Sequence, residues 1–343
     1  MSILYIGVDV GNTNSRMFGF TDDGEVIVEQ RMQTLCEDSW VRLLEKLSER
    51  YEVRLAYEVG PHYEWMQGLF ERYCSQVVLV NPAEFGVISK SQKKTDRRDA
   101  QKLAEGVRRG DLPEVFAPPK QSRADRRLVS FVHWLSRRQG SAKTRLRGLL
   151  LTYRLRCPVK DISSAKARKW FEEVGKKRMD EQGWCVAQML LAELALIEQQ
   201  RAELDKEVEK RLDHYGRAAE VLHSVPGFGP LTVLALVSMI VDIHRFESAK
   251  QLSAYFGACG KVYQSGKTLR LGSVTKRGNK TVRWLLSQAL CGLHRADPRA
   301  RKRYLRLKRR KHTGVARSAQ VNWLVGLVYY LLKTERQYRR KTA

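Results

Sequence analysis

The sequence predicts an α/β domain at the N-terminus, then long charged helices and a mostly α-helical C-terminal domain. Over the first 80 positions, short apolar runs alternate with turn residues, a pattern typical of strands. From position 122 onward, apolar residues recur at helical spacing with charged residues between them. Beyond position 221, apolar helical segments flank a stretch dense in glycine, lysine and arginine. We therefore expect three domains, at 1–120, 121–215 and 216–343.

The N-terminal domain begins with a predicted strand at 4–10, an apolar run that places Asp9 near its end. A turn at 11–14 leads to a second strand around 16–20, and Asp22-Asp23-Gly24 is a hairpin turn into a third at 25–31. A helix at 38–52, a strand at 53–59 that ends near Glu58, a short helix at 63–73 and a strand at 77–80 complete a β-β-β-α-β-α-β order. This order indicates an α/β sheet with carboxylates at strand ends, where open sheets place their sites.

An acidic pair lies within a very basic stretch, Lys94-Thr95-Asp96-Arg97-Arg98-Asp99. Thr95 is a favourable N-cap, so a helix that begins there carries Asp96 and Asp99 on one face of its first turn. Two adjacent carboxylates are costly on a plain surface, whereas a divalent metal that bridges to phosphate favours them. The alternative is a solvated helix start whose acids complement the helix dipole. Lys94, Arg97 and Arg98 are candidate contacts to nucleic acid.

The charge balance indicates a polyanionic partner. The chain has 63 Lys and Arg against 37 Asp and Glu, a formal charge of +26, without an amphipathic basic anchor or a lipidation signal. Nucleic acid is therefore the expected partner, and a membrane is not. The six cysteines form no CxxC pair or zinc-type cluster, and the longest apolar run, 323–332, is too short to span a bilayer. We expect a cytoplasmic protein without a disulfide framework.

The middle region predicts two long helices. Leu128, Phe131, Val132 and Leu135 follow helical spacing, as do Leu190, Leu194, Ile197 and Leu204. Helices of this kind form an antiparallel hairpin or coiled coil. The basic stretch between them, which contains Trp170, is either a solvated linker or a groove for phosphates.

The C-terminal region starts with Pro226-Gly227-Phe228-Gly229 before an apolar helix at 231–240. This turn resembles a helix-hairpin-helix element, in which Gly227 and Gly229 would expose backbone amides to phosphate; an ordinary interhelix turn is the alternative. A helix at 246–256 ends at Gly257, and a loop at 260–279 carries Ser265. An apolar helix at 321–332 is expected inside this domain. The candidate nucleic-acid contacts are Lys261, Lys267, Arg270, Lys276 and Arg277 in the loop, and Arg301, Arg303, Arg309 and Arg310 in the basic segment 299–311, whose alternative is a solvated helix face.

Asp9, Glu58, Asp96 and Asp99 are four acids that such a sheet could bring together. The arrangement resembles the RuvC-like branch of the RNase H fold, whose DEDD tetrad holds divalent metal for phosphodiester chemistry. Residues 7–13 also resemble the first phosphate loop of the sugar-kinase and actin superfamily, which would imply an ATP-dependent kinase. No second glycine-rich phosphate loop followed by an adenosine motif accompanies it.

The motifs GVDVGNTN, YEVG, NPAEF followed by KTDRRDA, SVPGFGPLTV, AYFGACGKVYQSGK and KRGNKTVRWLL together resemble one family. These are the bridge-RNA-guided insertion-sequence transposases, which join a RuvC-like DEDD domain to a serine-bearing C-terminal transposase domain and are related to the pilin-gene inversion enzyme Piv. The resemblance implies Mg²⁺ on the four acids and Ser265 as a nucleophile that forms a covalent phosphoserine bond to DNA. It also implies donor and target DNA, a structured noncoding guide (bridge) RNA, and a homo-oligomer, dimer or tetramer, with composite active sites.

Two other functions remain open at this point. A Mg²⁺-dependent DNA junction nuclease would use only the acidic tetrad and activate water. A non-catalytic nucleic-acid-binding protein would keep a degenerate RNase H fold.

Overall fold

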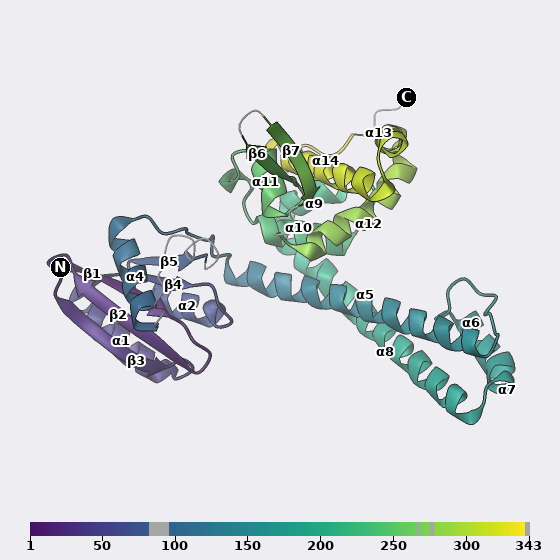
Figure 1. The fold of residues 1–343 in the computed structure, drawn as a ribbon, viewed down its shortest axis with the longest axis horizontal. Coiled ribbons are helices and arrows are strands. Elements are labelled where there is room, and N and C mark those ends of the chain that lie inside the picture. Colours follow the sequence, from purple (N-terminus) through teal and green to yellow (C-terminus); the bar gives the residue numbers. More distant parts are fainter. Residues whose placement is uncertain (82–95, 266–267, 275–277, 340–343) are drawn as a thin grey trace. The chain divides into compact units, whose positions relative to one another are not determined.

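The computed structural model describes residues 1–81, 96–265, 268–274 and 278–339, and the chain divides into two compact units, Met1–Lys120 and Gln121–Ala343 (Figure 1). The first unit is an α/β sheet structure, and the second consists of helices and one two-stranded sheet. No helix within the described ranges is long and apolar enough to cross a membrane. The six cysteines are free thiols.

The first unit is built on a five-stranded mixed sheet of order β3-β2-β1-β4-β5. Strand β1 pairs antiparallel with β2 and parallel with β4; β2 and β3 pair antiparallel, and β4 and β5 pair parallel. The predicted β-β-β-α-β-α-β order is confirmed, although the helix expected to reach residue 52 ends at Ser48, because β4 begins at Tyr51. The elements are β1 (Ser2–Asp9), β2 (Asn14–Thr21), β3 (Val26–Gln33), α1 (Glu37–Ser48), β4 (Tyr51–Glu58), α2 (Tyr63–Tyr73), β5 (Gln76–Val80) and α4 (Asp96–Arg109).

Each face of this sheet is covered by different helices. Side chains alternate along a strand, so Leu4, Ile6 and Val8 of β1 pack with Trp40 and Phe70 of α1 and α2. The other face packs against α4, where Tyr5 of β1 joins Leu103 and Ala104 in a second core. The two cores fix which face each residue at the strand ends occupies.

The second unit begins with a long antiparallel helical hairpin, α5 (Lys120–Thr152) and α8 (Glu181–Leu212) (Figure 1). Leu194 and Ile197 are buried as predicted. Phe131 follows the same helical spacing as Val132 and Leu135, but it is 46% exposed and stacks on Trp134, with ring centroids 5.3 Å apart. In this part of α5, Val132 and Leu135 are buried. The basic stretch after α5 is a folded cap, with α6 (Ala165–Trp170), a π-helical turn (Phe171–Gly175) and α7 (Lys176–Arg178) around their own small core.

The hairpin is joined firmly to the helical body at its base. Asp125 of α5 is 1% exposed and accepts hydrogen bonds from Arg211 Nε at 2.6 Å and from the Tyr215 hydroxyl at 2.7 Å. Arg126 donates to the carbonyl oxygens of Ser238 and Met239, which end helix α10. These contacts tie α5 to the C-terminal helices as one unit.

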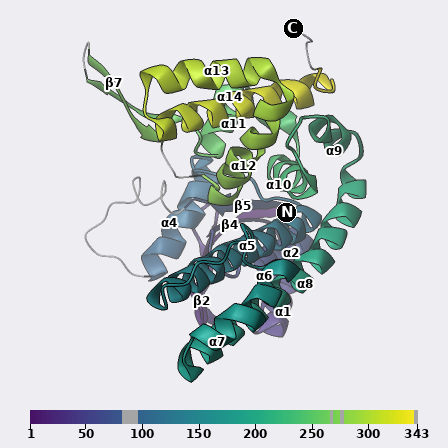
Figure 2. The ribbon, with the colours of Figure 1, turned by 90° about the vertical axis from the view of Figure 1, so that its right-hand side faces the viewer.

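The helical body is formed by α9 to α14, with α13 and α14 packed side by side (Figure 2). The predicted apolar helix near the C-terminus is confirmed, since Leu324, Val325 and Val328 of α14 are fully buried. The helix expected from Phe246 begins only at Ala249, because Ser248 caps it, and it ends as predicted at Gly257, whose φ is +61°. The helices are α9 (Gly216–His223), α10 (Pro230–Ile240), α11 (Ala249–Tyr255), α12 (Lys280–Ala296), α13 (Pro298–Arg310) and α14 (Thr313–Thr334), with short 3-10 turns at Asp213–Tyr215 and Ile243–Arg245.

The segment expected to be a loop at 260–279 contains an antiparallel hairpin, β6 (Gly260–Ser265) and β7 (Thr268–Val274), which projects from the helical body (Figures 1 and 2). The hairpin is anchored at its base, where a Cβ at Gly257 would lie 2.5 Å from the Gly278 amide nitrogen. Arg283 of α12 secures the same point by donating to the carbonyl oxygens of Phe256 at 2.8 Å and Gly278 at 2.7 Å. The prediction of a loop at 260–279 was wrong, because this segment contains two paired strands.

Candidate active site and nucleic-acid interface

Asp9 and Glu58 lie next to each other at the carboxyl ends of two parallel strands. Val8 of β1 is paired with Tyr57 of β4, so the residues that follow them are neighbours across the strand pair. Val8 and Tyr57 belong to the core under α1 and α2. Because successive residues of a strand alternate between faces, Asp9 and Glu58 occupy the opposite face, which α4 covers. Both residues are half-buried.

The turn after Asp9 is held by a small polar cluster. The Thr34 hydroxyl donates to the Gly11 carbonyl oxygen at 2.8 Å and is 2.9 Å from the Ser15 hydroxyl oxygen. The Thr34 amide donates to the Thr13 carbonyl oxygen at 2.9 Å. At Gly11 a Cβ would lie 2.3 Å from the Asn14 carbonyl oxygen, so this turn requires glycine. The carboxylate of Asp9 thus projects from a fixed strand end.

Helix α4 lies directly on β1. A Cβ at Gly7 would be 1.9 Å from the Ala100 carbonyl oxygen and 2.6 Å from the Ala104 amide nitrogen, so helix and strand approach backbone to backbone. At the far end of α4, the Arg108 guanidinium lies over the Phe20 ring, and Phe20 is paired with Tyr5. Since Tyr5 precedes Gly7 along β1, α4 runs antiparallel to β1. The first turn of α4 is therefore on the side of Asp9 and Glu58.

Asp96 is the first residue of α4, one helical turn before Ala100, and Asp99 immediately precedes Ala100. The predicted helix start is confirmed, while its expected N-cap, Thr95, lies outside the described residues. Asp99 is half-buried. The fold thus places the carboxyl ends of β1 and β4 and the first turn of α4 at the same face and the same edge of the sheet.

The chemistry of this donor set suits a hard divalent cation, which prefers carboxylate oxygens. Asp9 and Glu58 share a face of the sheet, and Asp99 lies on the helix that covers it. Among the side chains that the structure describes, no three carboxylate, imidazole or thiol groups converge closely enough to share one ion. The side chain of Asp96, the fourth acid, is not among them.

The cations beside the acids differ in their surroundings. Arg97 donates to Glu29 at 2.8 Å, and Arg16, which pairs with Asp9 across β1 and β2, donates to the same Glu29 carboxylate at 3.2 Å. Arg98 is exposed, and Lys94 lies outside the described residues. Arg97 therefore has a structural partner in addition to the nucleic-acid contact that we predict for it.

Ser265 is the last residue of β6 in the second unit, opposite Thr268 of β7. The register also pairs Tyr263 with Arg270, two positions from the Ser265 pair. Lys261 lies on β6. Lys267, Lys276 and Arg277 lie outside the described residues. Ser265 therefore lies at the end of a strand and not in a loop.

The two glycines of the 226–229 turn, for which we predict a role in phosphate binding, differ in their local geometry. Gly227 has φ +90°, and a Cβ there would lie 2.3 Å from the Ala289 carbonyl oxygen of α12. Gly229 is exposed at the N-cap of α10 and has open space around its Cβ position. Three acids, Glu209, Asp213 and Glu220, line a hollow beside Pro230. Phosphate binding by Gly227 and Gly229 stays a prediction, and these acids weaken its electrostatic basis.

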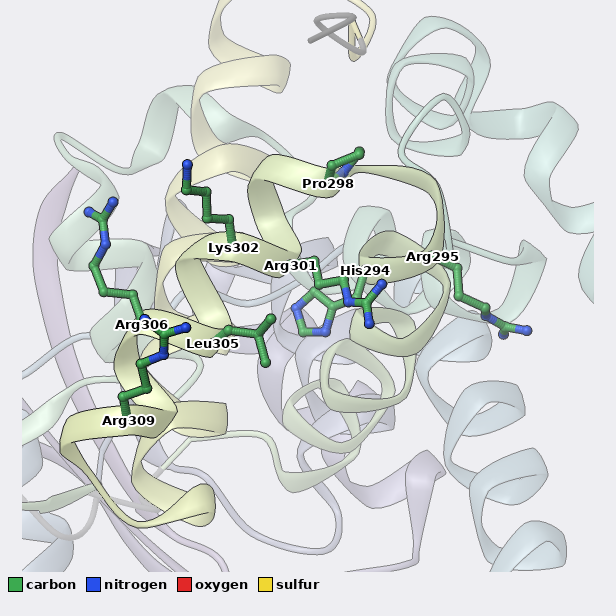
Figure 3. Close-up of a pocket in the computed structure, with 8 residues that line it drawn as sticks. All are labelled: His294, Arg295, Pro298, Arg301, Lys302, Leu305, Arg306 and Arg309. Carbon is green, nitrogen blue, oxygen red and sulfur yellow. The ribbon is translucent and has the colours of Figure 1, made fainter.

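A strongly basic concave surface lies between α12 and α13. This hollow of about 540 Å³ is defined by His294, Arg295, Pro298, Arg301, Lys302, Leu305, Arg306 and Arg309 (Figure 3). The six residues from α13 recur at positions i, i+3, i+4, i+7, i+8 and i+11, which is one continuous helical face. Figure 3 shows His294 and Leu305 between the arginine side chains.

The structure divides the predicted cations of α13 between two faces. Arg301 and Arg309 line the hollow, whereas the Arg303 guanidinium lies over the Trp323 ring of α14 at 5.5 Å. Arg310 is exposed; it follows Arg306 by four residues and Arg303 by seven, so it lies between the two faces. Lys302 and Arg306 belong to the basic segment 299–311 that the sequence predicted to contact nucleic acid, whereas sequence reasoning missed His294, Arg295 and Leu305, although the helical spacing from Pro298 could have found Leu305.

Comparison with known proteins matches both units to transposases. A model described as a transposase, of the IS110 DEDD type, matches residues 6–155, and the model of the transposase IS116/IS110/IS902 family matches residues 219–305. The transposase for insertion sequence element IS1111A of Coxiella burnetii is 25% identical over 348 positions, which cover 98% of this chain and 92% of that protein. The putative transposase y4qE of Sinorhizobium fredii is 24% identical (88% and 74% covered), and the pilin gene-inverting protein of Moraxella lacunata is 23% identical (82% and 80% covered). The first matched range contains all four acids, and the second contains Ser265 and Leu305.

Proposed function

We propose that this chain, which matches transposase models of the IS110 DEDD type and of the IS116/IS110/IS902 family, is a site-specific DNA recombinase of an insertion sequence, with Asp9, Glu58, Asp96, Asp99 and Ser265 as its catalytic residues. The DEDD match is consistent with an RNase H-like fold for the first unit and with divalent metal use in general. The single observation that carries the proposal is the meeting of the β1 and β4 carboxyl ends with the first turn of α4 on one face of the sheet.

The four acids would hold Mg²⁺, which supplies positive charge against the phosphate in the transition state. The Ser265 hydroxyl oxygen attacks the phosphorus of the scissile phosphodiester and forms a serine–phosphate ester. The bond from phosphorus to one deoxyribose oxygen breaks, and that oxygen leaves as a hydroxyl while the serine proton passes to solvent. A hydroxyl of the second DNA then attacks the phosphoserine, which restores a phosphodiester and regenerates serine. One bond forms as one breaks in each step, so strand exchange needs no ATP.

Donor and target DNA are the substrates, and a structured noncoding bridge RNA would select them by base pairing. In that arrangement the protein reads backbone shape and charge, which agrees with a formal charge of +26. The catalytic acids lie in one unit and the serine in the other. A homo-oligomer, dimer or tetramer, in which acids of one protomer meet the serine of another, would complete the site.

The test is strand transfer between matched donor and target DNA with the element's own RNA. We expect Asp9→Asn, Asp99→Asn and Ser265→Ala each to lower the rate by about 10²-fold or more, because the two acids would hold the metal and Ser265 would supply the attacking oxygen. Removal of divalent cations with a chelator should stop transfer, and added Mg²⁺ should restore it.

The matched controls remove the same chemical groups elsewhere. Asp23→Asn changes an exposed carboxylate on the β2–β3 turn, and Ser130→Ala changes an exposed hydroxyl on α5. Both should transfer strands at the parent rate. Full activity of Ser265→Ala would disprove the serine assignment, and full activity of the Asp9 and Asp99 variants would disprove the metal site.

A further inference from the structure

The hollow between α12 and α13 contains apolar side chains that are not needed to bind the phosphate backbone of a nucleic acid. Its rim carries five cations, namely Arg295, Arg301, Lys302, Arg306 and Arg309. Its centre is apolar, since Leu305 is 43% exposed there, beside the ring of His294 (Figure 3). A phosphate-binding face gains nothing from an exposed leucine.

Within the described residues, the rim cations have no ion-pair partner. None of the ion pairs found among the described residues involves any of the five. Arg301 and Lys302 lie near the N-terminus of α13, where the helix dipole disfavours positive charge, and the first turn has no acid. The described acids thus leave these cations available to an anionic ligand.

The floor of the hollow is rigid. Asp297, between α12 and α13, is 6% exposed and accepts hydrogen bonds from the amides of Arg299 at 2.7 Å and Ala300 at 3.2 Å. The Tyr338 hydroxyl also donates to Asp297. The His294 ring stacks on Tyr304 with centroids 4.9 Å apart, and its Nε2 is buried without a hydrogen-bond partner. The angle between the helices and the plane of the imidazole are thus set before any ligand binds.

We propose that this hollow binds one unpaired nucleotide, with its base against Leu305 and the His294 ring and its phosphates against the surrounding arginines. An apolar centre within a cationic rim matches a nucleotide, which has a flat apolar base face and an anionic phosphate on each side. A duplex keeps its bases stacked inside and presents only phosphates at such a surface. This inference rests on the proposed function, because a recombinase that exchanges strands must handle unpaired nucleotides.

The test measures binding of the full chain, with chelator present so that no strand is cut. The probes are an oligothymidylate strand, an abasic strand of equal length and phosphate number, and a duplex. We expect Leu305→Ser to weaken oligothymidylate binding by about fivefold or more and to leave abasic-strand and duplex binding unchanged. Arg306→Ala should weaken oligothymidylate and abasic-strand binding, because it removes a phosphate contact. Arg50→Ala removes one exposed arginine just after α1, in the first unit, and should change binding by less than about twofold.

Equal effects of Leu305→Ser on the oligothymidylate and abasic strands, or no effect on either, would overturn the inference. As an independent measurement, a strand that carries one 4-thiothymidine should crosslink to the peptide containing His294 or Leu305; crosslinks found only elsewhere would also overturn it. Leu305 is largely exposed, so its replacement leaves the core intact. Binding in chelator reports on the hollow and strand transfer reports on the proposed function, so either can fail without the other.

Discussion

Gly7→Ala tests whether contact between α4 and β1 places the acids. The added Cβ would lie 1.9 Å from the Ala100 carbonyl oxygen, whereas ordinary contacts begin at about 3.4 Å, so the helix must move by about 1.5 Å. The obstructing atoms are helix backbone and cannot rotate away. Overpacking of this kind costs about 1–3 kcal/mol, and the rigid neighbour places Gly7→Ala at the upper end, about 3 kcal/mol. Movement of the first turn of α4 should also lower strand transfer by about 10²-fold.

Urea unfolding of the full chain measures the first effect, and strand transfer measured well below the unfolding midpoint measures the second. Gly68→Ala is the matched control, because Gly68 is inside helix α2 with no atom within 4 Å of its Cβ position. Alanine there should be neutral or stabilise by up to about 1 kcal/mol. A Gly7→Ala protein as stable and as active as the parent would refute the placement of α4 on β1.

Two further predictions concern the second unit. Burial, together with two nearby cations, lowers the pKa of His133 below its usual 6.5. As the pH falls, the histidine of the unfolded chain is therefore protonated before that of the folded chain. The free energy of unfolding should thus fall as the pH drops below about 6.5. His133→Gln should make that pH dependence shallower in urea unfolding, and an unchanged slope would contradict the assignment. Asp125→Asn should destabilise the helical hairpin by about 2 kcal/mol or more, because it weakens the buried pair with Arg211 and the bond from Tyr215. Asp111→Asn, in an exposed pair, should cost less than about 0.5 kcal/mol, and equal costs for the two variants would show that burial is not the cause.

The sequence predicted the first unit well because its patterns are local. The strands of the sheet are short apolar runs bounded by turn residues, and the start of α4 has clear helix signals. The meeting of Asp9 with Glu58 followed from the rule that parallel strands place their carboxyl ends at one edge. The depth of the α4 contact was not predictable, because it depends on the space above Gly7, a property of two elements far apart in the chain.

The second unit was harder to predict because its charged residues obscure the hydrophobic pattern. In β6 and β7, apolar residues such as Val262 and Leu271 are separated by cations and glycines, so the hairpin reads as a loop. Phe131 satisfies helical spacing as well as Val132 does, and only the packing of α5 against its neighbours decides which is buried. On α13 the basic run was evident, but the division of Arg301 and Arg303 between two faces requires the position of α14.

The most direct test of the account is identification of the bond between protein and DNA during strand transfer. Reactions stopped in denaturant should contain a protein–DNA adduct, and mass spectrometry should map it to Ser265 in the parent protein. Asp99→Asn should form little of this adduct, because the serine acts only with the acids in place. Cut DNA ends without an adduct, or an adduct at another residue, would contradict the proposed joint action of the four acids and Ser265.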